Sequence, residues 1–217
     1  GLGIHESQSR LWENQVGRSL AFCEWSLPLW KENFSENMIE VSAEDLWRSV
    51  NMVQPSLIRT ESDEATYNLH IMIRYEIEKQ LISGEIEVDD LPKVWNQMYD
   101  QFLGIKVPSD SLGVLQDVHW SMGAFGYFPT YTLGNLYSAQ LLSAAKKDLG
   151  DINNQIRDGN FSPLLEWMRN KVHSRGSIIE PSELIKEATG YAPSSDDFVQ
   201  YLKNKINELY QINIDIR

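Results

Sequence analysis

The chain has 217 residues, 42% of them hydrophobic, which is enough for one large domain or two small ones with a buried core. Its 31 acidic and 19 basic residues give a formal net charge of −12, which argues against a nucleic-acid surface because phosphate binding needs clustered lysine and arginine. A single cysteine, Cys23, excludes an intrachain disulfide, and no signal peptide or long apolar run is visible. We expect a cytoplasmic protein that binds neither nucleic acid nor membranes.

The first segment, residues 4–13, has His5 and Glu6 side by side at the start of a helical, aromatic-rich run. A carboxylate at this place either complements the helix dipole or serves as a metal ligand, and the residues alone favour the dipole. The chain opens inside this segment without an initiator methionine, so we expect a part of a longer protein. Cys23 lies among Phe22, Trp25 and Leu27, which indicates a buried, inert thiol.

Arg59 precedes the next expected helix, residues 64–83. A planar guanidinium can meet both oxygens of a carboxylate, so Arg59 is a candidate for binding one in a substrate. The alternative is a surface pair with Glu61 or Asp63, worth little.

Within the 64–83 helix, Arg74 is a second candidate for the same role. Glu78 follows four residues later, and an i,i+4 ion pair would explain Arg74 equally well. His70 has no acidic neighbour at helical spacing, which favours a packing histidine over a ligand. Gly84 ends the helix.

Five more helices follow, most of them bounded by proline, serine or glycine. Pro92 suits the first turn of the helix expected over residues 90–103, and Ser195 with two following aspartates is expected to cap the last helix. If the chain has a domain boundary, we expect it near residues 174–182, where arginine, glycine, serine and proline gather. The expected ranges are 90–103, 133–149, 162–173, 182–189 and 196–210.

Residues 113–120 carry Gln116, Asp117 and His119 within four positions, followed by Trp120. Such groups are costly to bury without partners, so they form either a polar network that holds the fold or part of a site. His119 could donate a hydrogen bond to a developing oxyanion, with Asp117 or Gln116 fixing the loop or the tautomer.

Residues 123–132 are broken by Gly123, Gly126 and Pro129 and crowded with aromatic rings, which predicts an ordered aromatic loop or a short strand. Tyr127 and Tyr131 are each candidates to donate a hydrogen bond to a tetrahedral intermediate, and ring packing is the alternative.

Three motifs together resemble the thermostable carboxypeptidases of the carboxypeptidase Taq family, zinc enzymes that remove C-terminal residues from peptides. The motifs are His5-Glu6-Ser7-Gln8, Ile58-Arg59-x-x-Ser62-Asp63 (the family has alanine in place of Ser62) and Gly113-x-x-Gln116-Asp117-x-His119-Trp120. The family's H-E-x-x-H zinc helix does not occur in this chain.

The resemblance implies an all-α fold in which residues 1–217 form a single bundle-like domain, one wall of a zincin-type cleft. Glu6 would be a zinc ligand, and other divalent metals such as cobalt are conceivable. His119 with Tyr127 or Tyr131 would stabilise the oxyanion. Arg59, Arg74, Gln116 and Asp117 would form the substrate-binding group.

The resemblance also implies peptide substrates with a free C-terminal carboxylate and a homodimeric intact enzyme. Without the H-E-x-x-H helix, we expect this chain alone to be inactive and to bind no metal tightly. The rival hypothesis is a non-catalytic helical interaction or scaffold protein that keeps the family fold.

Overall fold

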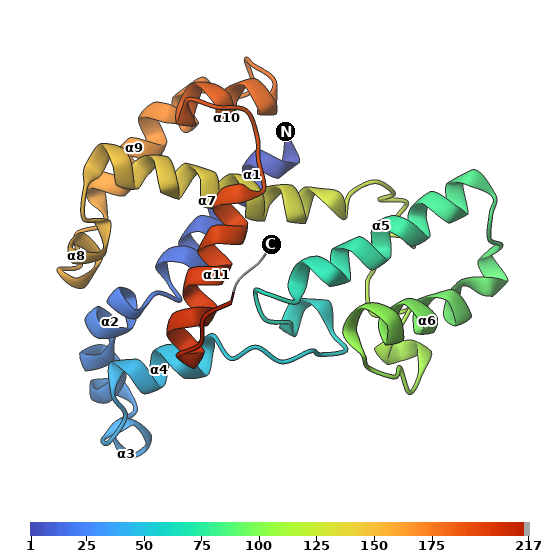
Figure 1. Cartoon of the computed structure of the whole chain (residues 1–217), viewed down its shortest axis with the longest axis horizontal. Helices are drawn as coiled ribbons and strands as arrows, with labels where there is room; N and C mark the ends of the chain where they lie inside the picture. The colour runs from blue at the N-terminus through green and yellow to red at the C-terminus, as the bar shows by residue number, and fades with distance from the viewer. Residues whose placement is uncertain (215–217) are drawn as a thin grey trace. The chain divides into compact units, whose positions relative to one another are not determined.

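The computed structural model describes residues 1–214, which are helical with connecting turns and contain no strand (Figure 1). The all-α prediction is therefore confirmed. The helices group into two compact units, one formed by residues 1–51 with 133–217 and the other by residues 52–132. Neither boundary falls near residues 174–182. The single-domain prediction stays a prediction, and each unit is described below by itself.

The first unit begins with α1 (Leu2–Arg10), which continues without a break into a π-helical stretch, Leu11–Val16. Within its apolar core, Leu11, Leu141, Met168 and Ile185 are fully buried. Cys23 is also buried, as predicted, and this burial raises the pKa of its thiol. The remaining helices are α2 (Leu20–Asn33), α3 (Ser35–Met38), α4 (Ala43–Val50), most of α7 (Pro129–Leu149), α8 (Ile152–Arg157), α9 (Ser162–Lys171), α10 (Pro181–Thr189) and α11 (Asp196–Tyr210).

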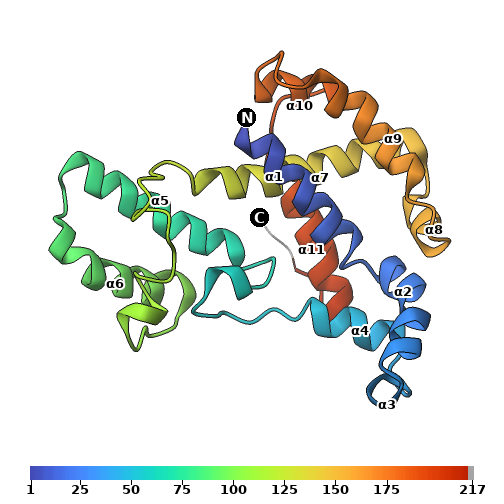
Figure 2. The same ribbon diagram turned by 180° about the vertical axis from the view of Figure 1, so that it is seen from behind.

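The second unit is built on α5 (Tyr67–Ser83) and α6 (Leu91–Leu103), which lie side by side in both views (Figures 1 and 2). Both helices end at a glycine with positive φ, Gly84 and Gly104, as the sequence predicts, because that conformation closes the last helical turn at little steric cost. Ile73, Ile77, Trp95, Tyr99 and Leu103 form the buried centre between them.

Helix ends match the expected ranges within a few residues, with two differences of detail. Residues 123–128 form an ordered turn-rich loop, whereas Pro129 already opens α7, so the alternative of a short strand is wrong. Proline suits that first position because it lacks the N–H that a helix start leaves unpaired. Ser195 precedes α11 without a capping bond from its side chain; Ser194 Oγ instead accepts from the Asp196 amide at 3.1 Å.

Candidate active site

Three polar side chains line one face of α5, where an apolar stripe would be expected. His70, Arg74 and Glu78 follow one another at four-residue spacing and therefore point the same way. Their exposed fractions are 0%, 0% and 5%. Buried groups of this kind need partners, and the partners come from Tyr99 on α6 and from the loop of residues 116–126.

Asp117 joins the two candidate arginines. Its Oδ1 accepts from Nη2 and Nε of Arg59 at 2.7 and 3.0 Å, and its Oδ2 accepts from Nε of Arg74 at 2.6 Å. Burial by itself would raise the pKa of Asp117, but the neighbouring Arg74 and Arg59 guanidiniums lower it below its ordinary value. The carboxylate is thus held ionised between two cations.

Gln116 completes the link between the loop and both arginines. Its side-chain oxygen accepts from the backbone N–H of Arg59 and from Nη2 of Arg74, both at 2.9 Å. Its amide nitrogen donates to the carbonyl of Leu57 at 3.0 Å and lies 3.3 Å from the Tyr99 hydroxyl. Every arm of this amide has a partner, so it fixes the loop relative to α5 and α6.

His119 lies next to this network. Its Nε2 is 3.0 Å from the Tyr131 hydroxyl, and its Nδ1 is 3.8 Å from Asp117 Oδ1. Burial lowers the pKa of His119; Asp117 opposes that shift, while Arg59 and Arg74 add to it. The imidazole is therefore neutral at pH 7 and has one N–H to donate.

The two candidate tyrosines differ in their contact with His119. Tyr131 forms the hydrogen bond described above, whereas Tyr127 contacts the imidazole only through ring packing, with centroids 5.5 Å apart. The His119 ring also packs at 4.3 Å against Phe128, which is fully buried. The arrangement places a neutral histidine and a phenol as hydrogen-bond donors beside a buried ion-pair network, which suits stabilisation of a developing negative charge.

Known proteins similar to this chain share one activity class. Residues 1–206 match the sequence pattern of the family described as carboxypeptidase Taq (M32) metallopeptidase. Thermostable carboxypeptidase 1 of Thermus thermophilus is 49% identical over 209 residues, which cover 96% of this chain and 41% of the relative.

Solved structures agree with that match. The crystal structure of the M32 carboxypeptidase from Deinococcus radiodurans superposes with a TM-score of 0.95 at 44% identity, covering 98% of this chain and 43% of that one. A Pyrococcus furiosus carboxypeptidase structure gives a TM-score of 0.92 at 46% identity, covering 94% and 41%. This chain belongs to the carboxypeptidase Taq (M32) family. It spans about two-fifths of the length of these relatives.

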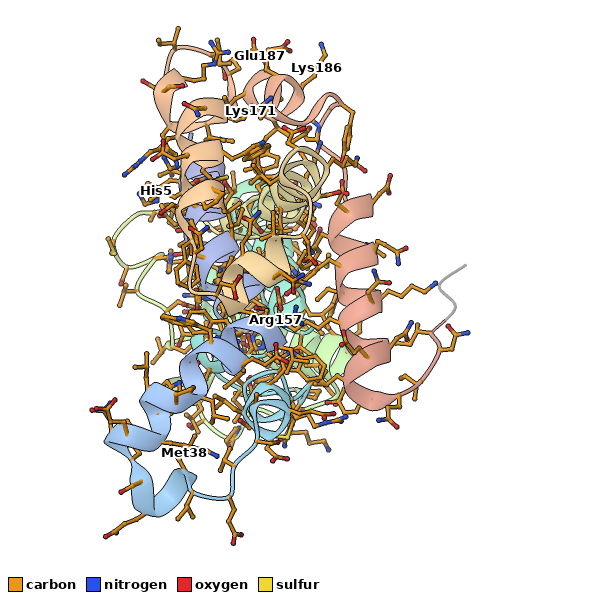
Figure 3. All side chains as sticks on the ribbon, turned by 90° about the vertical axis from the view of Figure 1, so that its left-hand side faces the viewer. His5, Met38, Arg157, Lys171, Lys186 and Glu187 are labelled. Carbon is orange, nitrogen blue, oxygen red and sulfur yellow. The ribbon has the colours of Figure 1, made fainter. Side chains whose placement is uncertain are left out.

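The M32 motif His5-Glu6-Ser7-Gln8 lies on α1, in the first unit. His5 is exposed on the outer side of the helix (Figure 3), and Glu6 is half-buried. The Glu6 carboxylate receives a long contact from the Ser9 hydroxyl, 3.4 Å from Oε2. Ser7 is fully buried, and the Gln8 side-chain oxygen lies 2.8 Å from His173 Nε2.

Glu6 fits the role of one carboxylate ligand to a metal, because its oxygens are not committed to a cation. Residues 1–214 contain no group of three or more His, Cys, Asp and Glu side chains that could hold a metal ion. Glu6 is thus a candidate for one ligand of a site that needs three or four.

Gly134 on α7 fits closely against Glu6. A Cβ atom on Gly134 would lie 2.5 Å from the Glu6 Cβ and 3.1 Å from its carbonyl carbon. A glycine in the middle of a helix costs about 0.5–1 kcal/mol relative to alanine, so this close approach gives it a reason to be there.

The second unit brings six of the predicted site residues into one network, and Tyr127 lies against that network through its ring. The six are Arg59, Arg74, Gln116, Asp117, His119 and Tyr131. Arg59 pairs with Asp117 and not with Glu61 or Asp63, which were the alternative partners. Arg74 likewise pairs with Asp117, while Glu78, its expected partner, accepts from the loop.

Sequence reasoning missed three members of the network. Tyr99 on α6 lies 3.0 Å from His70 Nδ1 through its hydroxyl, and the Tyr67 hydroxyl accepts from Arg59 Nη1 at 3.1 Å. Glu78 accepts two hydrogen bonds from the loop. The four-residue spacing of His70, Arg74 and Glu78 was a readable signal for a buried polar face of α5.

Proposed function

We propose that this chain is the C-terminal portion of a zinc metallocarboxypeptidase that releases C-terminal amino acids from peptides. Family membership supports the reaction class. The observation that carries the proposal is the neutral His119 bonded to Tyr131 beside the Asp117–arginine network. The intact enzyme is proposed to be a cytoplasmic homodimer, and this chain alone is proposed to be inactive.

His119 and Tyr131 are proposed to stabilise the oxyanion. As the scissile carbonyl becomes tetrahedral, its oxygen gains negative charge. Because the His119–Tyr131 bond uses one of the pair's two protons, the pair would donate the other, from the imidazole N–H or the phenol O–H, to that oxygen. When bound, the metal supplies a nucleophilic water and polarises the carbonyl. Glu6 would be one of its ligands, and Tyr127 keeps the rings packed.

Arg59 is proposed to receive the C-terminal carboxylate of the substrate. It is 7% exposed, whereas Arg74 is fully buried. Because Asp117 already binds the Nε–Nη2 edge of Arg59, the substrate would meet this guanidinium within a shared network. Arg74, Gln116 and Asp117 would act through Arg59 by holding it in place.

Substitution of His119 tests the oxyanion role. In the full-length enzyme, His119→Ala should lower kcat by about 10²–10³, the usual result of removing one such donor, with unchanged metal content. Tyr131→Phe should lower kcat far more than Tyr127→Phe, since only the Tyr131 hydroxyl bonds His119. Loss of metal in His119→Ala, or full turnover, would contradict the assignment.

Substitution of Arg59 tests the carboxylate role. Arg59→Lys keeps the charge but loses the planar fork, so transition-state binding should weaken by about 1–3 kcal/mol. A peptide amidated at its C-terminus should be a poor substrate and should not respond to Arg59→Lys. Arg157→Lys, at a surface pair with Glu24, is the matched control. If Arg59→Lys prefers the free C-terminal carboxylate over the amide as strongly as the wild type does, Arg74 would become the candidate for binding that carboxylate.

A non-catalytic helical interaction protein is the second candidate, favoured by the lack of a metal-binding group in residues 1–214. Calorimetry of the isolated chain with zinc should show only weak binding under the main proposal. A tight one-to-one complex, or release of amino acids by the isolated chain, would contradict its expected inactivity. A full-length protein that binds no metal would support the second candidate.

A further inference from the structure

Glu78 is a buried carboxylate that the proposed chemistry does not use. It lies on α5, one turn beyond Arg74, and is 5% exposed. Its Oε1 accepts from the indole N–H of Trp120 at 2.8 Å, and its Oε2 accepts from the backbone N–H of Gly126 at 3.1 Å. Both oxygens thus bind the loop that carries His119 and Tyr127.

These partners are unusual for a buried carboxylate. Carboxylates are seldom buried without a cation, because the loss of hydration must be offset. Glu78 receives its two hydrogen bonds from neutral donors. The two guanidiniums nearby, of Arg59 and Arg74, pair with Asp117.

The loop contacts of Arg74 and Glu78 lie on either side of His119 in the sequence. Arg74 binds Gln116 and Asp117 before His119, and Glu78 binds Trp120 and Gly126 after it. Both anchors project from the same face of α5, so one rigid helix sets the two ends of the loop. Gly126, whose N–H donates to Glu78, has a φ of +76°, a conformation that glycine adopts at little steric cost.

We propose that Glu78 is a positioning residue that holds the loop of residues 116–127 so that His119 and Tyr127 keep their places in the site. This inference rests on the proposed function of His119. Its physical basis is that a carboxylate can accept both N–H groups at once, whereas a carboxamide accepts with its oxygen and turns an NH₂ group toward the second donor.

The test compares Glu78→Gln with Glu76→Gln in the full-length enzyme. Glu76 lies on the same helix and forms an exposed pair with Lys79, which makes it a matched control. Glu78→Gln should speed hydrogen exchange of the Gly126 amide and the Trp120 indole, and should lower kcat roughly 10- to 100-fold with little change in KM, as expected when catalytic groups are misplaced. Glu76→Gln should change none of these quantities.

Trp120→Phe is the second variant in case Glu78→Gln fails to fold. It removes the indole donor and keeps a ring against Trp95 and Phe128. The two substitutions should be non-additive in kcat, because both break the same contact. Strict additivity would overturn the proposal.

Two further outcomes separate this inference from the proposed function. Unchanged hydrogen exchange in Glu78→Gln, or faster exchange with full kcat while His119→Ala is impaired, would overturn the positioning role. If His119→Ala itself keeps full kcat, the proposed function fails. Hydrogen exchange of the Gly126 amide in Glu78→Gln would still show whether Glu78 holds the loop.

Discussion

The two compact units differ in the kind of side chain that they bury. The first unit packs an apolar core around α7, with Leu141, Met168 and Ile185 fully buried. The second unit places His70, Arg74 and Glu78 inside, where each requires a partner of matching geometry. Apolar contacts tolerate small shifts in position, whereas a buried ion pair does not. Buried polar groups therefore contribute less to the stability of the second unit than apolar groups would, but they hold its side chains in fixed positions.

Asp117→Asn should have the largest effect, because it leaves Arg59 and Arg74 buried with only a neutral amide between them. Breaking a buried pair in this way costs about 3–5 kcal/mol of unfolding free energy. Urea denaturation would measure the loss, and hydrogen exchange should show it first in α5. Glu24→Gln, at the half-exposed pair with Arg157, is the control and should cost no more than about 1 kcal/mol. Similar losses of unfolding free energy in Asp117→Asn and Glu24→Gln would show that the buried and the surface ion pairs do not differ in their contribution to stability.

Met168→Ala should show the opposite behaviour in the apolar core. Met168 is fully buried, and truncation should cost about 2–5 kcal/mol through lost contacts and the cavity left behind. In the full-length enzyme, kcat measured well below the melting temperature should be preserved, because no polar group of the site is touched. A large loss of kcat in folded Met168→Ala would show that the apolar core also sets the site geometry.

Gly134→Ala probes a place where the apolar unit holds a functional candidate. The added methyl group would lie 2.5 Å from the Glu6 Cβ, so α1 and α7 must move apart at about 1–3 kcal/mol. Metal affinity of the full-length enzyme, measured by competition with a chelator, should fall if Glu6 is a ligand. Gly3→Ala is the control, since its Cβ would meet the Leu133 Cβ at the milder distance of 3.1 Å. Equal metal affinity in both variants would argue against a role for Gly134 in placing Glu6.

His70 should give the smallest effect near neutral pH. Burial lowers the pKa of His70 to about 3, with Arg74 and Arg59 adding to the shift. An unfolded histidine titrates near pH 6.5, so the stability contributed by neutral His70 is complete above that pH and declines as pH falls toward 3. The slope for one proton is at most about 1.4 kcal/mol per pH unit. His70→Gln should flatten the pH dependence of unfolding in this window, and an unchanged slope would mean that another group titrates there.

The ends of the helices were readable from the sequence because they depend on local chemistry. Gly84 and Gly104 end α5 and α6 in the left-handed conformation, and acidic residues occupy the first turn of α11. These effects act over four or five residues. The glycines predicted a loop or a short strand over residues 123–132; the loop is present as far as residue 128, and the position of Pro129 as a helix start was not predicted.

The network partners were not readable in the same way. The sequence nominated Arg59, Arg74, Gln116, Asp117 and His119, yet it offered each arginine a nearby acid as partner. In the structure both arginines instead pair with Asp117, which lies 58 residues from Arg59 and 43 from Arg74 in the sequence. Local spacing shows which groups could meet, but it does not show which pair will share a dry environment.

The sequence by itself determined the helical class, several helix ends and the identity of the motif residues, because periodicity, glycine stops and residue chemistry are local properties. The tertiary structure decided that one carboxylate serves two arginines, that Tyr131 rather than Tyr127 bonds His119, and that Glu78 binds the loop. Those choices follow from burial, since a group removed from water takes the partner that packing brings within hydrogen-bond distance.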